Sequence, residues 1–147
     1  MVQTFLPYPD FERTAAVLDR RRLGKQRVET LQICNALHKE RGGWVNHPVT
    51  RMWRGHEPAL VAYGLAIVRE WTAQGRADTV REKLLPHLHG EPDRTQEELA
   101  RLGMLPPWLG REDLHHAYRS ALVRKDPDFY RPLFPDATAD LEYVWPV

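Results

Sequence analysis

The sequence contains a single cysteine, Cys34, so no disulfide can form within the chain and a reducing cytoplasmic environment is expected. No apolar run approaches the roughly 20 residues that a membrane-spanning helix requires. The first residues, MVQTFLPYPDF, contain no basic stretch followed by a long apolar segment, which argues against a secretory signal peptide. These absences predict a cytoplasmic protein that does not contact membranes.

Motifs of several common enzyme classes are also missing. The sequence has neither the G-x-x-x-x-G-K loop that cradles phosphates nor the G-x-G-x-x-G turn of dinucleotide-binding domains. It also lacks the G-x-S-x-G turn that carries the nucleophile of many hydrolases. Cys34 shares a helical apolar stripe with Leu23, Leu31 and Leu37, so it is expected in the core and not as a nucleophile.

The histidine spacing does not predict a metal site. Histidines occur in two close pairs, His87 with His89 and His115 with His116. No cysteine pair is present, and no histidine has a second histidine four residues away, as helical metal motifs require. We therefore expect these side chains at the surface or in helix packing, with no metal and no cofactor.

The composition is typical of one mainly α-helical domain covering residues 1–147. Hydrophobic residues make up 42% and charged residues 28% of the 147 residues, as in ordinary globular proteins. Only VQTFL and EYVWPV have the composition of strands, and both are terminal. Periodicity and capping residues predict about four to six helices with long loops, within the segments 10–18, 20–41, 58–74, 78–85, 95–102, 112–125 and 127–133.

A cluster of cations occupies the stretch LDRRRLGKQRVETLQ. Residues 1–60 carry 10 Lys and Arg against 6 Asp and Glu, whereas residues 61–147 carry 11 against 14, and the net charge is only +1. Cations near a helix N-terminus oppose the helix dipole, so their presence favours an anionic ligand, with DNA phosphate foremost. The alternative is a solvated basic face paired with nearby carboxylates. The cluster comprises Arg20, Arg21, Arg22, Lys25 and Arg27.

Two further stretches combine cations with aromatic residues. In GGWVNHPVTRMWRGHEP, aromatic rings could stack on an unpaired base or fill the gap left by a flipped one, while arginines bind the backbone. The alternative places the tryptophans in the core and the polar residues on a loop surface. In HHAYRSALVRKDPDFYRPLFP, the alternative is an amphipathic helix that packs on the core. The candidate DNA contacts are His47, Arg51, Trp53, Arg54, His56, Arg119 and Lys125.

Three stretches in this order resemble the pyrimidine-dimer DNA glycosylase family, also called endonuclease V. They are LPYPDFERTAAVLDRRRLGKQ, NHPVTRMW and HHAYRSALVRKDPDFYRPLF. The last contains Lys125-Asp126-Pro127 and Tyr130, similar to an RDP-x-x-Y pattern of the family. The resemblance covers most of the chain. It implies an endonuclease V-like helical monomer that binds damaged duplex DNA, flips a base and needs no metal.

The resemblance also implies a mechanism. The amine of the processed N-terminus attacks the sugar of a damaged pyrimidine nucleotide, forms a Schiff base and nicks the strand by β-elimination. Val2 is small enough for removal of Met1, so its amine is the expected nucleophile, with the Met1 amine as the alternative. An α-amine has a pKa of about 7.7–8.0, so part of it is neutral at pH 7.

The sequence departs from the family at one catalytic position. Members carry a Glu directly after an Arg at the start of the arginine-bearing helix, and the matching stretch here is Asp19-Arg20-Arg21-Arg22. An Arg there repels a neighbouring iminium cation. The nearest carboxylates are Asp19, a candidate substitute, and Glu29, about two turns further on. The expected catalytic set is therefore Val2, Asp19 and Arg21, in a divergent member that lacks the usual Glu.

Two other functions fit the same residues. The chain could be a non-catalytic protein that binds bent or damaged DNA on this fold. It could instead be an enzyme on a small phosphorylated substrate, with arginines holding the phosphate and Asp19, His47 or His116 transferring protons.

Overall fold

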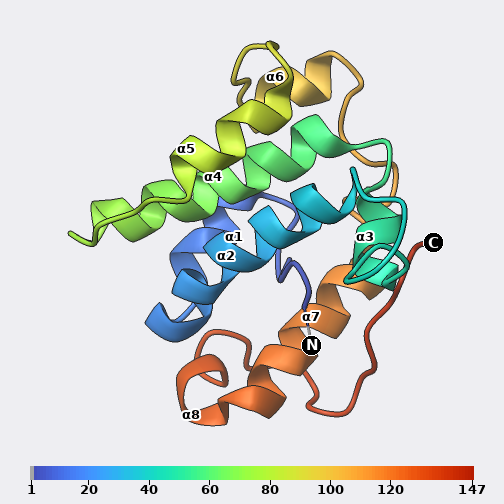
Figure 1. Cartoon of the computed structure of the whole chain (residues 1–147). Coiled ribbons are helices and arrows are strands. Elements are labelled where there is room, and N and C mark those ends of the chain that lie inside the picture. Colours follow the sequence, from blue (N-terminus) through green and yellow to red (C-terminus); the bar gives the residue numbers. More distant parts are fainter. Residues whose placement is uncertain (1) are drawn as a thin grey trace.

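The computed structural model describes residues 2–147, and every regular element in that range is helical (Figure 1). This confirms the predicted mainly α class. Helices number more than the four to six expected because several span only one turn or so. No helix in the described range is long and apolar enough to cross a membrane. The elements are α1 (Phe11–Val17), α2 (Arg20–Ala36), α3 (Pro48–Trp53), α4 (Glu57–Ala73), α5 (Arg81–Leu84), the 3-10 helix η1 (Leu85–Leu88), α6 (Gln96–Arg101), α7 (Glu112–Lys125) and α8 (Pro127–Tyr130).

Helix α2 begins as the sequence predicts and ends earlier. Asp19 is its N-cap, and the carboxylate accepts a hydrogen bond from the backbone N–H of Arg22 at 3.4 Å. The helix stops at Ala36, about a turn before the expected end at residue 41. Beyond it, the N–H groups of His38 and Lys39 bond to carbonyls only three residues back, each at 3.2 Å. Such bonds form a tighter, 3-10 type turn, which closes the carboxyl end of the helix.

Helix α3 lies between the predicted helical segments 20–41 and 58–74, where the sequence predicted no helix. The side chain of His47 takes the N-cap role, and its Nδ1 accepts from the N–H of Val49 at 3.0 Å. Pro48 then occupies the first helical position, where its missing N–H costs nothing. Histidine is not among the usual capping residues, so this helix start carried no recognisable signal.

The amino-terminal segment, residues 2–6, is buried between helices instead of forming a strand (Figure 1). The indole N–H of Trp53 donates to Thr4 Oγ1 at 3.0 Å. His115 Nδ1 lies 2.8 Å from the carbonyl of Leu6, and its Nε2 accepts from Gly110 N–H at 2.9 Å. Side chains from helices thus satisfy the polar backbone of this segment, which fixes the amino-terminal end of the chain in space.

Helices α2 and α4 pack side by side at a close approach that depends on Gly64 (Figure 1). A Cβ at Gly64 would lie 2.8 Å from Thr30 Cγ2 and 2.9 Å from Leu84 Cδ1, both buried. We expect Gly64→Ala to destabilise the protein by about 1–3 kcal/mol in chemical denaturation, despite the better helix propensity of alanine. Gly24→Ala is the comparison: its Cβ would meet a single half-buried side chain, the Trp71 ring at 2.8 Å, instead of two fully buried ones. An equal or smaller loss for Gly64→Ala would contradict this account.

Candidate functional site

One face of α2 carries polar and charged side chains toward the amino-terminal segment. Arg22, Lys25, Gln26 and Glu29 are spaced i, i+3, i+4 and i+7, which places them on the same side of a helix. Gln26 and Glu29 are buried, with Glu29 only 8% exposed. Buried polar groups require partners, and these two find theirs in the backbone of residues 2–6.

Gln26 joins α2 to the amino-terminal segment. Its Nε2 donates to the carbonyl of Gln3 at 2.9 Å and to Glu29 Oε2 at 3.0 Å. Its Oε1 accepts from Phe5 N–H at 3.0 Å and lies 2.7 Å from the hydroxyl of Tyr63. With donors and acceptor all engaged, Gln26 holds the segment in one register against the helix.

Glu29 lies beside the first described residues. Its Oε2 accepts from the backbone N–H of Gln3 at 3.3 Å. The nitrogen of Val2 is one residue further, about 3–4 Å along the backbone. The side chain of Val2 is buried in the core, which anchors that nitrogen near Glu29. Met1, the alternative source of the amine, lies outside the described residues.

A cavity of about 250 Å³ opens at this point. The amino-terminal segment and one face of α2 form most of its wall, and the last turn of α7 contributes a lysine. Four cations therefore surround a single buried carboxylate, from elements far apart in the sequence. The lining residues are Gln3, Phe5, Arg21, Arg22, Lys25, Gln26, Glu29 and Lys125.

Burial and neighbouring charges shift the pKa values of two groups in this cavity. Burial raises the pKa of Glu29 above its ordinary value, although the hydrogen bond from Gln3 and the charge of Lys25 oppose the rise. Burial also lowers the pKa of Lys125, helped by the positive charges of Arg22 and other nearby cations. Crowding of like charges is unfavourable until an anion arrives, so the cavity is suited to bind phosphate or a carboxylate.

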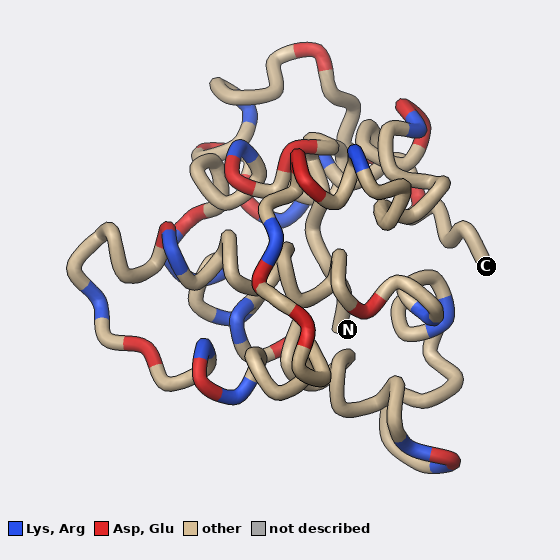
Figure 2. The backbone as a smooth tube through the Cα atoms, turned by 90° about the horizontal axis from the view of Figure 1, so that it is seen from above, with Lys and Arg blue, Asp and Glu red and all other residues tan. Residues whose placement is uncertain are grey.

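Figure 2 shows Lys and Arg interspersed with Asp and Glu along the backbone, in keeping with a net charge of +1. The positive charge at the cavity is therefore a local feature. This agrees with the basic amino-terminal part of the sequence and its balance by the remainder.

The Asp19 side chain is engaged in structural interactions at the start of α2. Its carboxylate caps the helix, forms an ion pair with Arg22 at 3.2 Å and accepts from the hydroxyl of Tyr130. Burial raises its pKa, but the hydrogen bonds from Tyr130 and Arg22 outweigh that effect and hold the pKa below its ordinary value. Asp19 does not line the cavity that holds Glu29.

The remaining cations of the cluster face elsewhere. Arg20 and Arg27 line a shallow depression of about 670 Å³ with Asp19 and Trp71. Arg27 forms an ion pair with Asp78, and its guanidinium lies 4.4 Å from the centroid of the Trp71 ring. Arg27 is thus held by partners within the chain, whereas Arg20 is exposed.

The segment around α3, residues 42–58, contributes some side chains to the core and others to the surface. Trp53 is fully buried against Tyr63 and Trp108, so it cannot stack on a base, which corrects that prediction. Arg51 and Arg54 are exposed. Two guanidinium nitrogens of Arg54 lie 3.4–3.5 Å from backbone carbonyls, and Arg51 stays a predicted DNA contact.

Three other residues predicted to contact DNA, His47, His56 and Arg119, do not line the cavity that holds Glu29. His47 caps α3 and packs edge-on against Trp145, at 5.7 Å between ring centroids. Burial lowers the pKa of both His47 and His56, which favours their neutral forms. Arg119 binds the carbonyl of Pro7 at 2.8 Å and pairs with Glu112, away from the cavity.

Gln26 was not predicted from the sequence as a site residue, and Glu29 was ranked below Asp19 as the catalytic carboxylate. A signal was present: both interrupt the apolar stripe that Leu23, Thr30 and Ile33 continue on α2. Polar residues at buried helix positions point to a specific partner or a site. Lys125 could not be added to them from helix periodicity, because α7 lies about a hundred residues away in the chain.

The comparisons with known proteins bear on the first part of the chain. A family model described as pyrimidine dimer DNA glycosylase matches residues 2–83, which is more than half of the sequence. The matched part contains the amino-terminal segment, the cation cluster and Glu29, while Lys125 lies beyond it. No curated protein matches the chain, and no solved structure does.

Proposed function

The chain belongs to the pyrimidine dimer DNA glycosylase family, and from this membership we propose that it excises damaged or modified pyrimidines from duplex DNA and then nicks the strand at the abasic site. We further propose that it acts as a monomer. One observation carries the proposal: the amino-terminal segment, residues 2–6, is held beside a buried carboxylate in a cavity lined by four cations.

The proposed nucleophile is the α-amine of Val2, exposed by removal of Met1. The small side chain of Val2 permits that removal. An α-amine with a pKa of about 7.7–8.0 is unprotonated to about a tenth at pH 7, so no special activation is required. The buried Val2 side chain and the Gln26 bridge would keep this nitrogen in place during attack.

The proposed reaction proceeds in two stages. The amine attacks C1′ of the damaged nucleotide, and the glycosidic C1′–N1 electron pair leaves with the pyrimidine, which takes up a proton. Opening of the sugar ring gives a protonated Schiff base between C1′ and the amine. A base then removes a proton from C2′, and the electrons expel the 3′ phosphate by breaking the C3′–O bond. Water hydrolyses the Schiff base, which restores the amine.

Glu29 is the carboxylate that we assign to this chemistry in place of Asp19. It lies within one residue of the proposed nucleophile, whereas Asp19 is engaged with Arg22 and Tyr130. An ionised Glu29 would stabilise the cationic Schiff base, and its raised pKa makes proton uptake by the carboxylate easier than for an ordinary glutamate. In this proposal Glu29 takes the role of the family's acidic residue, further along α2 than the sequence suggested.

The four cations would hold the phosphates on either side of a flipped nucleotide. We expect Lys125→Ala to weaken binding to any duplex and to reduce the slope of log affinity against log salt by about 1, since each phosphate contact adds about 0.9. Lys39→Ala, on an exposed residue outside the cavity, is the control and should leave the slope unchanged. Equal slopes for Lys125→Ala and the wild type would remove Lys125 from the interface.

Borohydride trapping tests the proposed function directly. The purified protein is incubated with duplexes that carry a cyclobutane pyrimidine dimer, an abasic site or no lesion, and borohydride is added to reduce any Schiff base. A covalent protein–DNA complex on the first two duplexes, with no complex on the third, is expected. Salt-sensitive binding without a trapped complex would instead identify a non-catalytic damaged-DNA-binding protein. Absence of both would favour a small phosphorylated ligand.

A further inference from the structure

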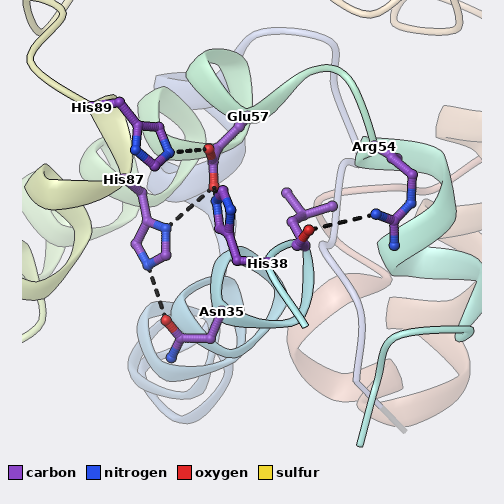
Figure 3. Close-up of polar contacts among 7 residues, drawn as sticks. Asn35, His38, Arg54, Glu57, His87 and His89 are labelled. Carbon is purple, nitrogen blue, oxygen red and sulfur yellow. Dashed lines mark hydrogen bonds and ion pairs between the residues drawn. The ribbon is translucent and has the colours of Figure 1, made fainter. Parts of the chain in front are cut away.

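Four side chains with metal-binding atoms meet at the end of α2 that lies away from the candidate site. His38 follows the C-cap of α2, Glu57 opens α4, and His87 and His89 come from η1 and the residue after it (Figure 3). One ligand atom from each lies within 4.8 Å of all the others. Seven residues of α2 separate Glu29, which lines the cavity, from Ala36 at the helix end, so the cluster lies beyond about 10 Å of helical rise from the cavity.

The carboxylate of Glu57 is the centre of the cluster. Its Oε2 lies 2.6 Å from His38 Nε2 and 3.2 Å from His87 Nδ1, and its Oε1 lies 2.7 Å from His89 Nε2. The rings of His38 and His87 stack with centroids 5.6 Å apart. Three imidazole rings thus converge on one carboxylate, which together make a mixed nitrogen and oxygen donor set of the kind that transition metals bind.

Asn35 orients the His87 ring. Its Oδ1 lies 2.9 Å from His87 Nε2, and Nδ1 of the same ring lies 3.2 Å from Glu57 Oε2 (Figure 3). Asn35 thus contacts the outer nitrogen of the ring, while the other nitrogen faces the centre of the cluster. A hydrogen-bonded partner on the distal ring nitrogen is the usual support of a metal-bound histidine.

The backbone at His89 adds an independent observation. His89 has φ +52°, and it is the one residue other than glycine with a positive φ in the part of the chain that the structure describes. Side chains bearing a Cβ adopt this left-handed conformation at a cost, and Gly90 stands directly beside it. The conformation directs the His89 ring back to Glu57.

We propose that His38, Glu57, His87 and His89 form a binding site for a divalent transition metal, with Zn²⁺ as the best match. Imidazole nitrogen and carboxylate oxygen are zinc ligands at about 2.0–2.2 Å, and four protein ligands are typical of a structural zinc site. The ion would link three elements through their side chains: the carboxyl end of α2, the start of α4 and the η1 turn. Two ligands fall beyond residues 2–83, so the site is not confined to the matched family region.

The test measures zinc binding to the untagged, chelator-treated protein by competition with a chromophoric chelator. We expect one Zn²⁺ per chain in the wild type and loss of affinity by about 100-fold or more in His89→Asn. Asparagine tolerates the left-handed backbone, so this variant keeps the turn and removes only the ring. His116→Asn, which changes a histidine outside the cluster, should bind as the wild type does.

Two further measurements distinguish the loss of a metal ligand from a loss of folding. Co²⁺ added to the wild type should give the intense visible bands of a four-coordinate site, and these should be missing in His89→Asn. Asn35→Ala should lower zinc affinity by about 10–100-fold through loss of the support for His87. Far-UV circular dichroism checks that each variant is folded. No tight zinc binding by the wild type, or equal binding by folded His89→Asn, would overturn the proposal.

Discussion

A form of the protein in which the Val2 amine is blocked will form no borohydride-trapped complex with DNA, even though the rest of the cavity is intact. The reason is chemical: a Schiff base needs a primary amine, and an amide nitrogen cannot replace it. The structure makes the amine of Val2 the candidate because Glu29 Oε2 lies 3.3 Å from the next backbone nitrogen, that of Gln3. We expect loss of all trapping and of dimer-specific nicking.

The experiment uses a single fusion protein. An amino-terminal extension ends in a protease site whose cleavage leaves Val2 as the first residue. The uncleaved protein should bind duplex DNA with unchanged salt dependence, since the cations of the cavity remain, and should give no adduct. Cleavage should restore the adduct. Restoration rules out a general folding defect as the cause of the loss.

Lysines in the same cavity provide the sharpest competing explanation. Lys25 and Lys125 both line it, and burial with nearby cations lowers the pKa of Lys125, which makes its amine more nucleophilic near neutral pH. A trapped complex that persists in the uncleaved fusion and disappears in Lys125→Ala would assign the nucleophile to the lysine. That result would contradict the amino-terminal mechanism while leaving the cavity as the active site.

Local signals predicted the helices well where caps and periodicity coincide. Asp19 caps α2 at the predicted start, and Thr95 with Glu98 forms a capping box at the start of α6, within the predicted segment 95–102. The end of α2 was misplaced at residue 41 because Gly42 and Gly43 follow it, but these glycines mark a turn and the helix ends at Ala36. α3 escaped notice because a histidine ring, not a Ser, Thr, Asp or Asn, caps it.

The candidate site was harder to predict than the helices, for a physical reason. Charge density indicated the cation cluster on α2, and three of its five members, Arg21, Arg22 and Lys25, line the cavity. Which carboxylate accompanies them depends on how residues 2–6 cross α2, and the hydrogen bonds of Gln26 decide that crossing. The zinc-type cluster illustrates the same limit, since His38, Glu57 and His87 are brought together by packing and not by spacing.

Glu29→Gln should lower dimer-specific nicking by about 10²–10⁴-fold, the usual contribution of a positioned acid or base. Glutamine keeps an oxygen that can accept from Gln3 N–H and Gln26 Nε2, so the fold and DNA binding should be retained. Burial disfavours the charged form of Glu29, so its removal should not lower the melting temperature at neutral pH.

The pH profile gives a second readout for Glu29. Because burial raises its pKa, the wild type should lose activity on the acid side at a pH above the ordinary glutamate value, as the carboxylate is protonated. Protonation of the α-amine, whose pKa is about 7.7–8.0, also lowers activity as the pH falls, so Glu29→Gln should keep that part of the acid limb and lose the additional fall that protonation of Glu29 causes in the wild type. A change that affected only folding would lower activity at every pH alike.

Asp19→Asn is the matched variant that separates the two carboxylates. Asparagine caps helices about as well as aspartate, so α2 should still begin at Arg20 and the protein should stay folded. The Asp19 carboxylate holds Arg22 and Tyr130 and does not line the cavity, so we expect this variant to lose at most about tenfold in nicking. If Asp19→Asn is the inactive variant and Glu29→Gln the active one, the position of Glu29 beside the amino-terminal segment is structural. The catalytic carboxylate would then be the one that caps α2.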